Sequence, residues 1–448
     1  MKFSPNPREF LFAIWEGGGN APPTLEVARK LVERGHRVRW IGDACQEAES
    51  RQVGVEFLPW TDAPSRHTRH RDSDFLRDHE AADAPGQFAL LRDRLMLGPA
   101  LHYARDVARE LDRRRADVLV SSEMLFGAML AAEARDTPLV LLGANLSLFP
   151  IPGLPPAGSG LAPARTAEER ARIAQFEAAG RALLNVGLSS LNAARRQFAL
   201  APIADVGQQA AVASRYLLLT SRAFDFQADS LPERIRYVGP ELKDPSWSAP
   251  WKSPWPTNDE RPLVLVAFST TFQNQLATVA RTITALESLP VRATVTLGPA
   301  LQDLPVSGAE NIQVVASASH SDILGAAAAV ITHAGHGTVM RALAAGVPLL
   351  CMPMGRDQND NAVRVATRGA GLELSPAASV AQIRSAIQQL LGDSTYRRAA
   401  QTLGEAVLRD AAGSTVIEEL EAAAAVSALK SRPVPVRDRS DAPCSTFS

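Results

Sequence analysis

Residues 328–365 constrain the fold more than any other part of this 448-residue sequence. They begin with a short apolar run, residues 329–332, of the kind found in strands buried on both faces of a parallel sheet. Residues 338–345 are good helix formers that stop at Gly346, and a second apolar run, 347–352, follows. This order predicts a strand, a helix and a second parallel strand, the repeating unit of an α/β sheet.

Polar loops follow the carboxyl ends of both predicted strands. The first loop, residues 333–337, holds two glycines, which let the backbone turn sharply and let a ligand approach it. A helix that starts just beyond a strand offers free N–H groups and the positive end of its dipole, which favour phosphate. The second loop, residues 353–361, follows the carboxyl end of the neighbouring strand. Both loops therefore line one crevice. We therefore predict a ligand site here, although His333 alone could be structural and Asp357-Gln358 alone could cap the next helix.

Length and composition limit the class of protein. A chain of 448 residues suits two domains of about 200 residues each. Its 47 basic and 48 acidic side chains leave a net charge of −1, so no overall field attracts nucleic acid or an anionic membrane. The three cysteines are far apart in sequence and predict neither a disulfide framework nor a metal site. The apolar run at residues 10–15 is too short for a signal peptide or a membrane span, so we expect a cytoplasmic protein.

The first half of the chain opens with the same pattern. Residues 10–15 predict a strand, residues 16–23 a glycine loop, residues 24–34 a helix and residues 38–41 a second strand. The glycine loop therefore also follows the carboxyl end of a strand. Its position predicts a second half of a binding crevice.

The composition of three segments indicates irregular structure. Residues 62–87 are polar and predict a long surface loop over the cleft mouth, in which His67, His70 and His79 are most simply solvated side chains. Residues 145–156 are apolar and proline-rich, which fits either a pocket for a hydrophobic acceptor or packing at a domain edge. Residues 239–261, with three tryptophans and five prolines, predict an interdomain linker whose tryptophans could also meet a ligand.

One combined pattern is specific enough to resemble a known family. It consists of His333-x-Gly335-x-Gly337-Thr338, then Gly346-Val347-Pro348, then Asp357-Gln358-x-x-Asn361. This resembles the nucleotide-sugar donor signature of family 1 glycosyltransferases, in its bacterial antibiotic and macrolide form. The resemblance implies an α/β protein of the GT-B fold, in which two Rossmann-like domains face each other across a central cleft.

The resemblance also implies an activity. We predict an inverting, metal-independent glycosyltransferase that moves a sugar from a UDP- or dTDP-sugar to a hydrophobic small molecule, such as a phenol or a polyketide-like natural product. The nucleotide sugar is a co-substrate, and no cofactor is expected. We expect a monomer or homodimer with no nucleic-acid partner.

The family layout divides the chain as follows. Residues 1–238 would form an acceptor-binding domain, 239–261 a linker, 262–410 a nucleotide-sugar-binding domain, and 411–430 a helix that crosses back to the first domain. Residues 431–448 are rich in proline, serine and charge and are predicted to be disordered.

Donor-binding residues are carried over from the family pattern onto matching positions. Ser269 and Thr270 follow a predicted strand, where hydroxyls can bond diphosphate oxygens, and His320 falls in the nucleobase-binding segment. Asp357 and Gln358 would hold sugar hydroxyls. Two positions depart from the family: an aromatic residue that stacks on the base is missing near Ser317, and Arg341 replaces a ribose-binding glutamate. The complete predicted donor set is Ser269, Thr270, His320, His333, Gly335, His336, Gly337, Thr338, Asp357 and Gln358.

Activation of the acceptor departs from the family as well. The position of the family's catalytic histidine, three residues before Pro23, holds Asn20, whose neutral amide cannot act as a general base. In the family, an acidic residue at the end of the strand predicted at residues 117–121 holds the catalytic histidine. Ser122 stands at that aligned position here, and the nearest acidic residue is Glu123, one place further on. Asn20 could orient the acceptor hydroxyl or merely shape the turn. Glu123 could be the base or only a carboxylate at a helix start, and an acidic acceptor would need less help from either.

Two rival functions share the predicted fold. One is an epimerase or phosphorylase that acts on sugar nucleotides or phosphates. The other is a non-catalytic auxiliary protein, suggested by the missing histidine. The donor signature argues against both, because the epimerase or phosphorylase would share the fold but not this signature, and an auxiliary protein has no need of sugar-binding groups.

Overall fold

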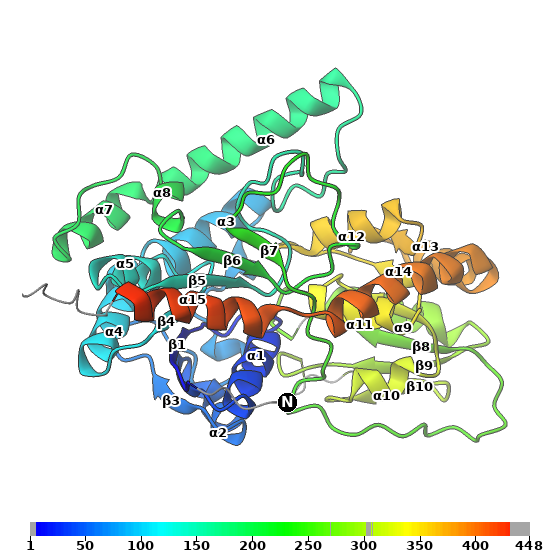
Figure 1. Ribbon diagram of the computed structural model, residues 1–448. Coiled ribbons are helices and arrows are strands. Elements are labelled where there is room, and N and C mark those ends of the chain that lie inside the picture. Colours follow the sequence, from blue (N-terminus) through cyan, green and yellow to red (C-terminus); the bar gives the residue numbers. More distant parts are fainter. Residues whose placement is uncertain (1–5, 269, 302–305, 307, 431–448) are drawn as a thin grey trace, which may run out of the picture.

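The computed structural model describes residues 6–430 except residues 269, 302–305 and 307, and it contains two parallel sheets flanked by helices (Figure 1). Ser269 and the tail at residues 431–448, for which the sequence made predictions, lie outside the described residues. The first sheet contains β1 (Glu9–Ala13), β2 (Arg37–Gly42), β3 (Glu56–Pro59), β4 (Val118–Ser122), β5 (Leu139–Gly143), β6 (Arg215–Leu218) and β7 (Ile235–Tyr237). The second sheet contains β8 (Leu263–Ala267), β9 (Arg292–Thr296), β10 (Ile312–Val315), β11 (Ala327–Thr332), β12 (Leu349–Cys351) and β13 (Gly371–Glu373).

The strand order places a switch point in the middle of each sheet. The first sheet runs β3-β2-β1-β4-β5-β6-β7 and the second β10-β9-β8-β11-β12-β13. The direction of winding therefore reverses between β1 and β4, and again between β8 and β11. Open α/β sheets bind ligands beyond the carboxyl ends of the strands at such points. The α/β fold class with two Rossmann-like domains is confirmed.

Helices cover the faces of both sheets (Figure 1). The helices of the first half are α1 (Ala21–Glu33), α2 (Glu47–Gln52), α3 (Ala84–Leu91), α4 (Ala100–Arg113), α5 (Phe126–Ala134), α6 (Ala167–Asn185), α7 (Leu188–Gln197) and α8 (Gly207–Ala210). Those of the second half are α9 (Leu276–Glu287), α10 (His320–Leu324), α11 (His336–Ala344), α12 (Gln358–Thr367), α13 (Val380–Gly392), α14 (Ser394–Ala412) and α15 (Val416–Lys430). Between α3 and α4 the regular α-helix is interrupted at residues 92–99, where Pro99 has no N–H to continue the ladder.

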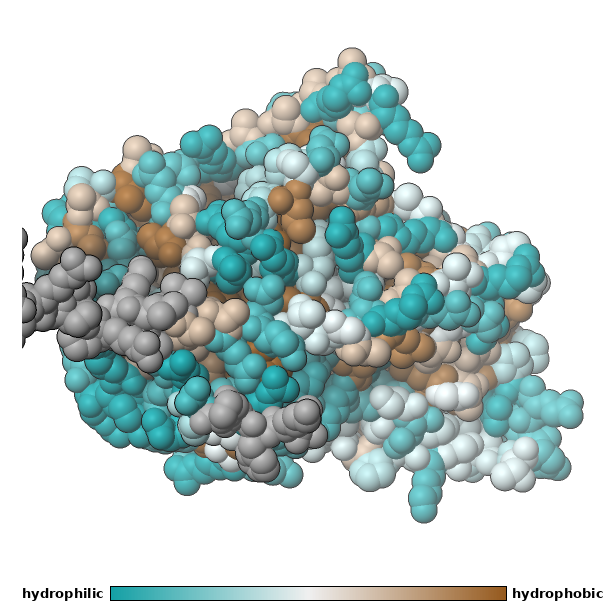
Figure 2. Space-filling model, in the orientation of Figure 1, coloured by the Kyte–Doolittle hydropathy of each residue, from teal (hydrophilic) through white to brown (hydrophobic). Residues whose placement is uncertain are grey.

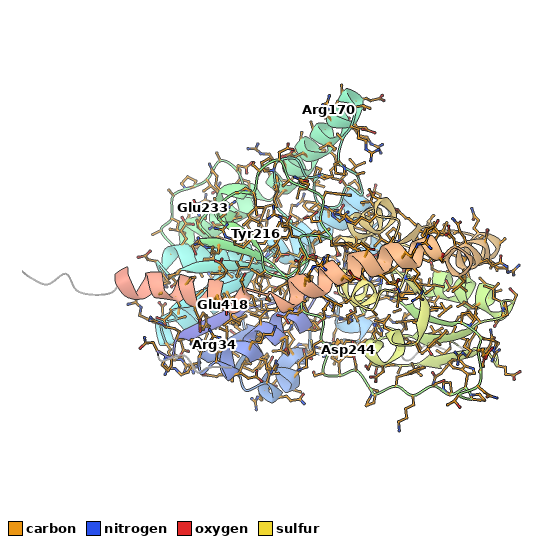
Figure 3. All side chains as sticks on the ribbon, turned by 45° about the vertical axis from the view of Figure 1, so that its right-hand side comes forward. Arg34, Arg170, Tyr216, Glu233, Asp244 and Glu418 are labelled. Atoms are coloured by element: carbon orange, nitrogen blue, oxygen red, sulfur yellow. The ribbon has the colours of Figure 1, made fainter. Side chains whose placement is uncertain are left out.

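The central strands are apolar because both of their faces are covered. Every residue of β1, β4, β5 and β8 is buried, as expected for parallel strands between helix layers. The last helix, α15, packs on the first domain through Val416, Ile417 and Leu420 (Figure 1). Its Glu418 lies 3.9 Å from Arg34 at the end of α1 (Figure 3). The chain end therefore ties the first domain to the second.

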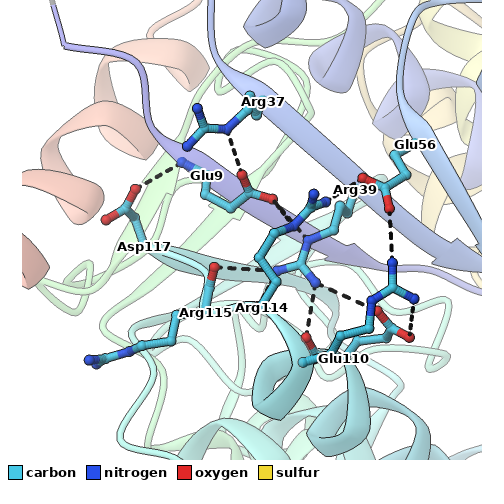
Figure 4. Close-up of polar contacts among 9 residues, drawn as sticks. Glu9, Arg37, Arg39, Glu56, Glu110, Arg114, Arg115 and Asp117 are labelled. Atoms are coloured by element: carbon cyan, nitrogen blue, oxygen red, sulfur yellow. Dashed lines mark hydrogen bonds and ion pairs between the residues drawn. The ribbon is translucent and has the colours of Figure 1, made fainter.

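A charged network lies at the amino-terminal ends of the strands of the first sheet, opposite the ends that the predicted ligand site follows. Glu9 accepts hydrogen bonds from Nε of Arg39 and Nε of Arg37, each at 2.9 Å, and its own N–H donates to Asp117 (Figure 4). These residues lie at the amino ends of β1, β2 and β4. Because the ligand groups follow the carboxyl ends, this network serves stability and takes no part in the site.

The segment at residues 62–87 is more than a surface loop. Its Arg66, Asp74 and Asp78 are buried, and Asp78 accepts hydrogen bonds from Arg356 of the second domain at 2.8 and 2.9 Å. The ring of His79 packs edge-on against Phe272, with 4.9 Å between the ring centroids. The prediction of solvated histidines is wrong for His79, which packs between the two domains, whereas His67 is exposed and the side chain of His70 is 33% exposed.

No helix of the described residues is long and apolar enough to cross a membrane. The face drawn in Figure 2 is mostly hydrophilic, with hydrophobic residues in small separate patches.

Candidate active site

A pocket of about 290 Å³ lies between the two domains, at the carboxyl edges of both sheets. Its walls come from the loops after β1, β4 and β5 on one side and from those after β8, β11 and β12 on the other. The pocket-lining residues that the sequence singled out are Asn20, Glu123, Thr270, His320, His333, Gly335, His336, Gly337, Thr338, Asp357 and Gln358. The two switch points thus face each other, which places every described candidate residue at one cavity.

The turn between β11 and α11 presents the start of a helix to the pocket. Gly335 is the residue before the first helical turn, so α11 starts at His336, two residues earlier than the sequence predicted. The N–H of Thr338 donates to the carbonyl of Gly335 at 3.0 Å. The N–H groups that remain for a ligand are therefore those of residues 335–337. A Cβ on Gly335 would clash with Nε2 of His333, so the imidazole needs a glycine beneath it.

The three predicted histidines differ in their surroundings. Burial lowers the pKa of His333 to about 4, and that of His320 also to about 4, so both rings are neutral near pH 7. Nε2 of His320 lies 3.2 Å from Oγ1 of Thr296. Nε2 of His336 is 2.7 Å from Oγ1 of Thr220, so this ring joins the two domains. His333 and His320 can offer a ligand hydrogen bonds but no positive charge.

The loop after β12 is held by its own amides. Gln358 accepts a hydrogen bond from the N–H of Met354 and donates one to Gln273, both at 2.8 Å. Nδ2 of Asn361 donates to Asp357 at 2.9 Å and to the carbonyl of Ala334 at 3.0 Å. Asn361 therefore links the loops after β11 and β12, and Gln358 braces the second of them.

Two carboxyl groups face the pocket from opposite domains. Burial, with a smaller contribution from the negative charge of Asp357, raises the pKa of Glu123 to about 7. Burial also raises the pKa of Asp357 to about 6, with Asp360 adding to the shift. Glu123 is 8% exposed, so its carboxyl group is screened from bulk water but open to a bound molecule. A pKa near 7 is that of an effective general base at neutral pH.

The side-chain amide of Asn20 forms hydrogen bonds within the glycine loop. Its Oδ1 accepts the N–H of Gly17, and its Nδ2 donates to the carbonyl of Trp15, both at 2.9 Å. Glu16 holds the same loop by accepting the N–H of Gly18 at 2.8 Å. This geometry favours the interpretation of Asn20 as the residue that shapes the turn.

The apolar segment after β5 divides into two parts. Residues 145–148 line the pocket, whereas Ile151 is buried in the core of the first domain. One part of this segment therefore lines the pocket, and another part packs in the core of the first domain. Phe88 and Leu91 of α3 and Met124 after β4 add to the apolar wall.

The linker contributes residues that the sequence left undecided. Asp244 and Trp247 line the pocket, whereas Trp251 and Trp255 pack against the core of the second domain. Asp360 is a further residue that sequence reasoning missed. It accepts the N–H groups of Gly158 and Gly160 at 2.6 and 2.8 Å, and so fastens the segment after β5 to α12. An acidic residue in a first helical turn was its only sequence signal.

No group of three or more His, Cys, Asp or Glu side chains that could hold a metal occurs among the described residues.

Comparison with known proteins agrees with this geometry. Residues 287–423 match the family described as "Erythromycin biosynthesis protein CIII-like, C-terminal domain". The chain is 28% identical to 4'-demethylrebeccamycin synthase of Lentzea aerocolonigenes, over 90% of this chain and 96% of that protein. It is also 28% identical to zeaxanthin glucosyltransferase of Pseudescherichia vulneris, over 88% of this chain and 93% of that protein.

Solved structures with the same fold include the glycotransferase of kitacinnamycin, at a TM-score of 0.73 and 20% identity, covering 94% of this chain and 100% of that one. Another is the glycosyltransferase VinC in complex with dTDP, at a TM-score of 0.64 and 16% identity, covering 93% and 100%. The fold, the site and these relatives define the chain as a glycosyltransferase of the GT-B fold. It is similar to the family 1 glycosyltransferases of bacterial antibiotic pathways, as its donor signature predicted.

Proposed function

We propose that this glycosyltransferase moves a sugar from a UDP- or dTDP-sugar to a hydrophobic small-molecule acceptor, a phenol or polyketide-like natural product, with inversion and without a metal ion. The observation that carries the proposal is a pocket that the start of α11 and Glu123 line together from opposite domains. In this scheme residues 1–238 bind the acceptor, and residues 262–410 bind the donor. The relatives do not favour an epimerase or an auxiliary protein.

The donor half of the pocket suits a diphosphate. The free N–H groups of residues 335–337 and the dipole of α11 attract negative charge at one point. Neutral His333 and the hydroxyl of Thr270 add hydrogen-bond donors beside it. These groups stabilise the charge that develops on the leaving diphosphate. Asp357 would accept hydrogen bonds from sugar hydroxyls, and Gln358 would keep its loop in place.

The acceptor half suits an apolar molecule with a reactive hydroxyl. Phe88, Leu91, Met124, Leu146 and Leu148 supply the apolar wall. One relative is named a zeaxanthin glucosyltransferase, and zeaxanthin is likewise a hydrophobic molecule with hydroxyl groups.

Glu123 would be the general base of a single displacement. The acceptor hydroxyl gives its proton to the Glu123 carboxylate while its oxygen attacks the anomeric carbon. The bond from that carbon to the diphosphate breaks, and the diphosphate leaves with the bonding electron pair. Attack on the face opposite the leaving group inverts the anomeric configuration. A phenolic acceptor is more acidic than an alcohol and would make a lower demand on this base.

A donor and acceptor screen tests the proposal. The purified protein is incubated with UDP- and dTDP-hexoses and a panel of phenolic and polyketide-like acceptors, and the products are read by mass spectrometry and by NMR of the anomeric centre. We expect a product heavier by one sugar residue, with inverted configuration, in the presence of EDTA. An NMR spectrum showing retained configuration would contradict the displacement scheme. Absence of transfer from every donor, together with no thermal stabilisation by UDP or dTDP, would reject the donor-site proposal.

A further inference from the structure

The guanidinium group of Arg341 lies at the start of α11, inside the pocket. Its side chain is 14% exposed, and the residue sits one helical turn after Gly337. Nη1 and Nη2 of Arg341 are 3.5 and 3.6 Å from the position that a Cβ on Gly337 would occupy. Long side chains on a helix lean back toward its amino end, and this one reaches the first turn. A fixed positive charge therefore lies beside the free N–H groups of that turn.

The hydrogen-bonding capacity of Arg341 is unused. Its Nε is buried and has no hydrogen-bond partner among the described residues. The nearest opposite charge is Asp244 of the linker, with Oδ1 3.5 Å from Nε. The other oxygen of Asp244 already accepts bonds from the hydroxyl of Ser319 at 2.9 Å and the N–H of Ser321 at 3.0 Å. Asp244 thus steadies the guanidinium without occupying its outer nitrogens.

The other arginine of the pocket is fully engaged. Arg356 donates from Nε and Nη2 to Asp78 and from Nη1 to the hydroxyl of Thr271 at 3.1 Å. It holds the domains together and has no donor pair left for a ligand. Of these two guanidinium groups, Arg341 is the one that can face an anion.

We propose that Arg341 binds the diphosphate of the nucleotide-sugar donor through the paired N–H groups of its guanidinium. This inference rests on the proposed function and adds a residue to the donor site. A guanidinium fork matches two phosphate oxygens, and such charge-assisted pairs are stronger than neutral hydrogen bonds. Gly337, which has no side chain, leaves the space between the fork and the helix start open to the phosphate. The positive charge of Arg341 would then offset the negative charge that grows on the leaving diphosphate.

A ligand series of graded charge tests this role. Calorimetry measures the binding of UDP, UMP and uridine, and of dTDP, dTMP and thymidine, to the wild type, to Arg341→Gln and to Arg341→Lys. We expect Arg341→Gln to weaken binding of the diphosphates by about 10- to 100-fold, the monophosphates less, and the nucleosides by less than about twofold. Arg341→Lys, which keeps the charge but loses the fork, should fall between the wild type and Arg341→Gln.

Arg51→Gln is the matched control. It removes one positive charge from a side chain of α2 that is 68% exposed, pairs with Glu47 at 2.6 Å and does not line the pocket. Because this charge is solvated, we expect every affinity to change by less than about twofold. A loss equal to that of Arg341→Gln would show a general field effect and would overturn the assignment.

The outcomes separate the two proposals. A wild type that binds none of the six ligands rejects the donor site and Arg341's role with it. In a second outcome, the wild type binds the diphosphates, and Arg341→Gln loses affinity for diphosphates and nucleosides by the same factor. This outcome rejects only the role of Arg341, because an arginine that merely holds Asp244 affects all ligands alike. If Arg341→Gln does not fold, the same comparison is made with Arg341→Lys, where a loss that grows with ligand charge supports the proposal and an even loss overturns it.

Discussion

Replacing Glu123 by glutamine separates stability from catalysis at one carboxyl group. The pKa of this group is raised from 4.5 to about 7, mainly by burial. The difference of about 2.5 units corresponds to about 3 kcal/mol, at about 1.4 kcal/mol per unit. The unfolded chain ionises this group at a lower pH than the folded chain, so wild-type stability falls as pH rises from about 4.5 to about 7 and the loss is constant above that. Glutamine carries no such charge, so the variant should be more stable than the wild type above pH 7, by up to about 3 kcal/mol.

Catalysis should change in the opposite direction. If Glu123 is the general base, wild-type kcat/KM rises with pH through about 7 and then levels off, because only the carboxylate accepts a proton. The glutamine variant should lose about 10²- to 10⁴-fold in rate and show no such rise. Urea unfolding at pH 5, 7 and 8 gives the stability, and single-donor kinetics over the same range give the profile. An unchanged rate and an unchanged pH profile would refute the assignment of Glu123 as base.

Glu241→Gln serves as the control for this experiment. Glu241 is also a buried pocket carboxyl group, but it is paired with Nζ of Lys30 at 2.6 Å. Burial raises the pKa of Glu241 too, but the pairing with Lys30 offsets part of that shift, so we expect a smaller gain in stability than for Glu123→Gln and a pH profile of the wild-type shape. A gain as large as that of Glu123→Gln would mean that removing any buried carboxyl group stabilises this protein equally.

Three further predictions follow from the site. Asn20→Ala removes two hydrogen bonds of the glycine loop and should lower the free energy of unfolding by about 1–3 kcal/mol, while the midpoint of the pH–rate profile stays that of Glu123; a shifted midpoint would show that Asn20 acts on the base. Gly335→Ala places a Cβ against the ring of His333 and should weaken UDP or dTDP binding by about tenfold or more with little change in thermal stability, whereas unchanged affinity in calorimetry would exclude a role for this ring in donor binding. Arg356→Gln leaves Asp78 buried and unpaired and should cost about 3–5 kcal/mol in urea unfolding, part of which the double variant with Asp78→Asn recovers; equal costs for the single and double variants would show that the two residues are not coupled.

Local sequence patterns were sufficient for much of the fold and of the donor loop. Apolar runs, glycine stops and helix formers depend on neighbouring residues only, so the strands and the position of the loops after β1, β8 and β11 followed from them. The start of α11 was misplaced by two residues, because glycine and histidine are weak helix formers and their inclusion depends on the turn at Gly335.

The directions and partners of the side chains were decided by the tertiary structure. Arg356 and Asp78 are separated by 278 positions, and His336 and Thr220 by 116, so no local pattern relates them. Only the folded loops show that the amides of Asn20 and Gln358 hold backbone and side-chain groups of the protein, because no local pattern indicates these partners. The sequence by itself determined that a helix would start beyond the carboxyl end of a buried strand, where we propose that phosphate binds. The packing of two domains and a linker around one pocket decided that Glu123 and Arg341 face it, because burial and pairing are set by residues distant along the chain.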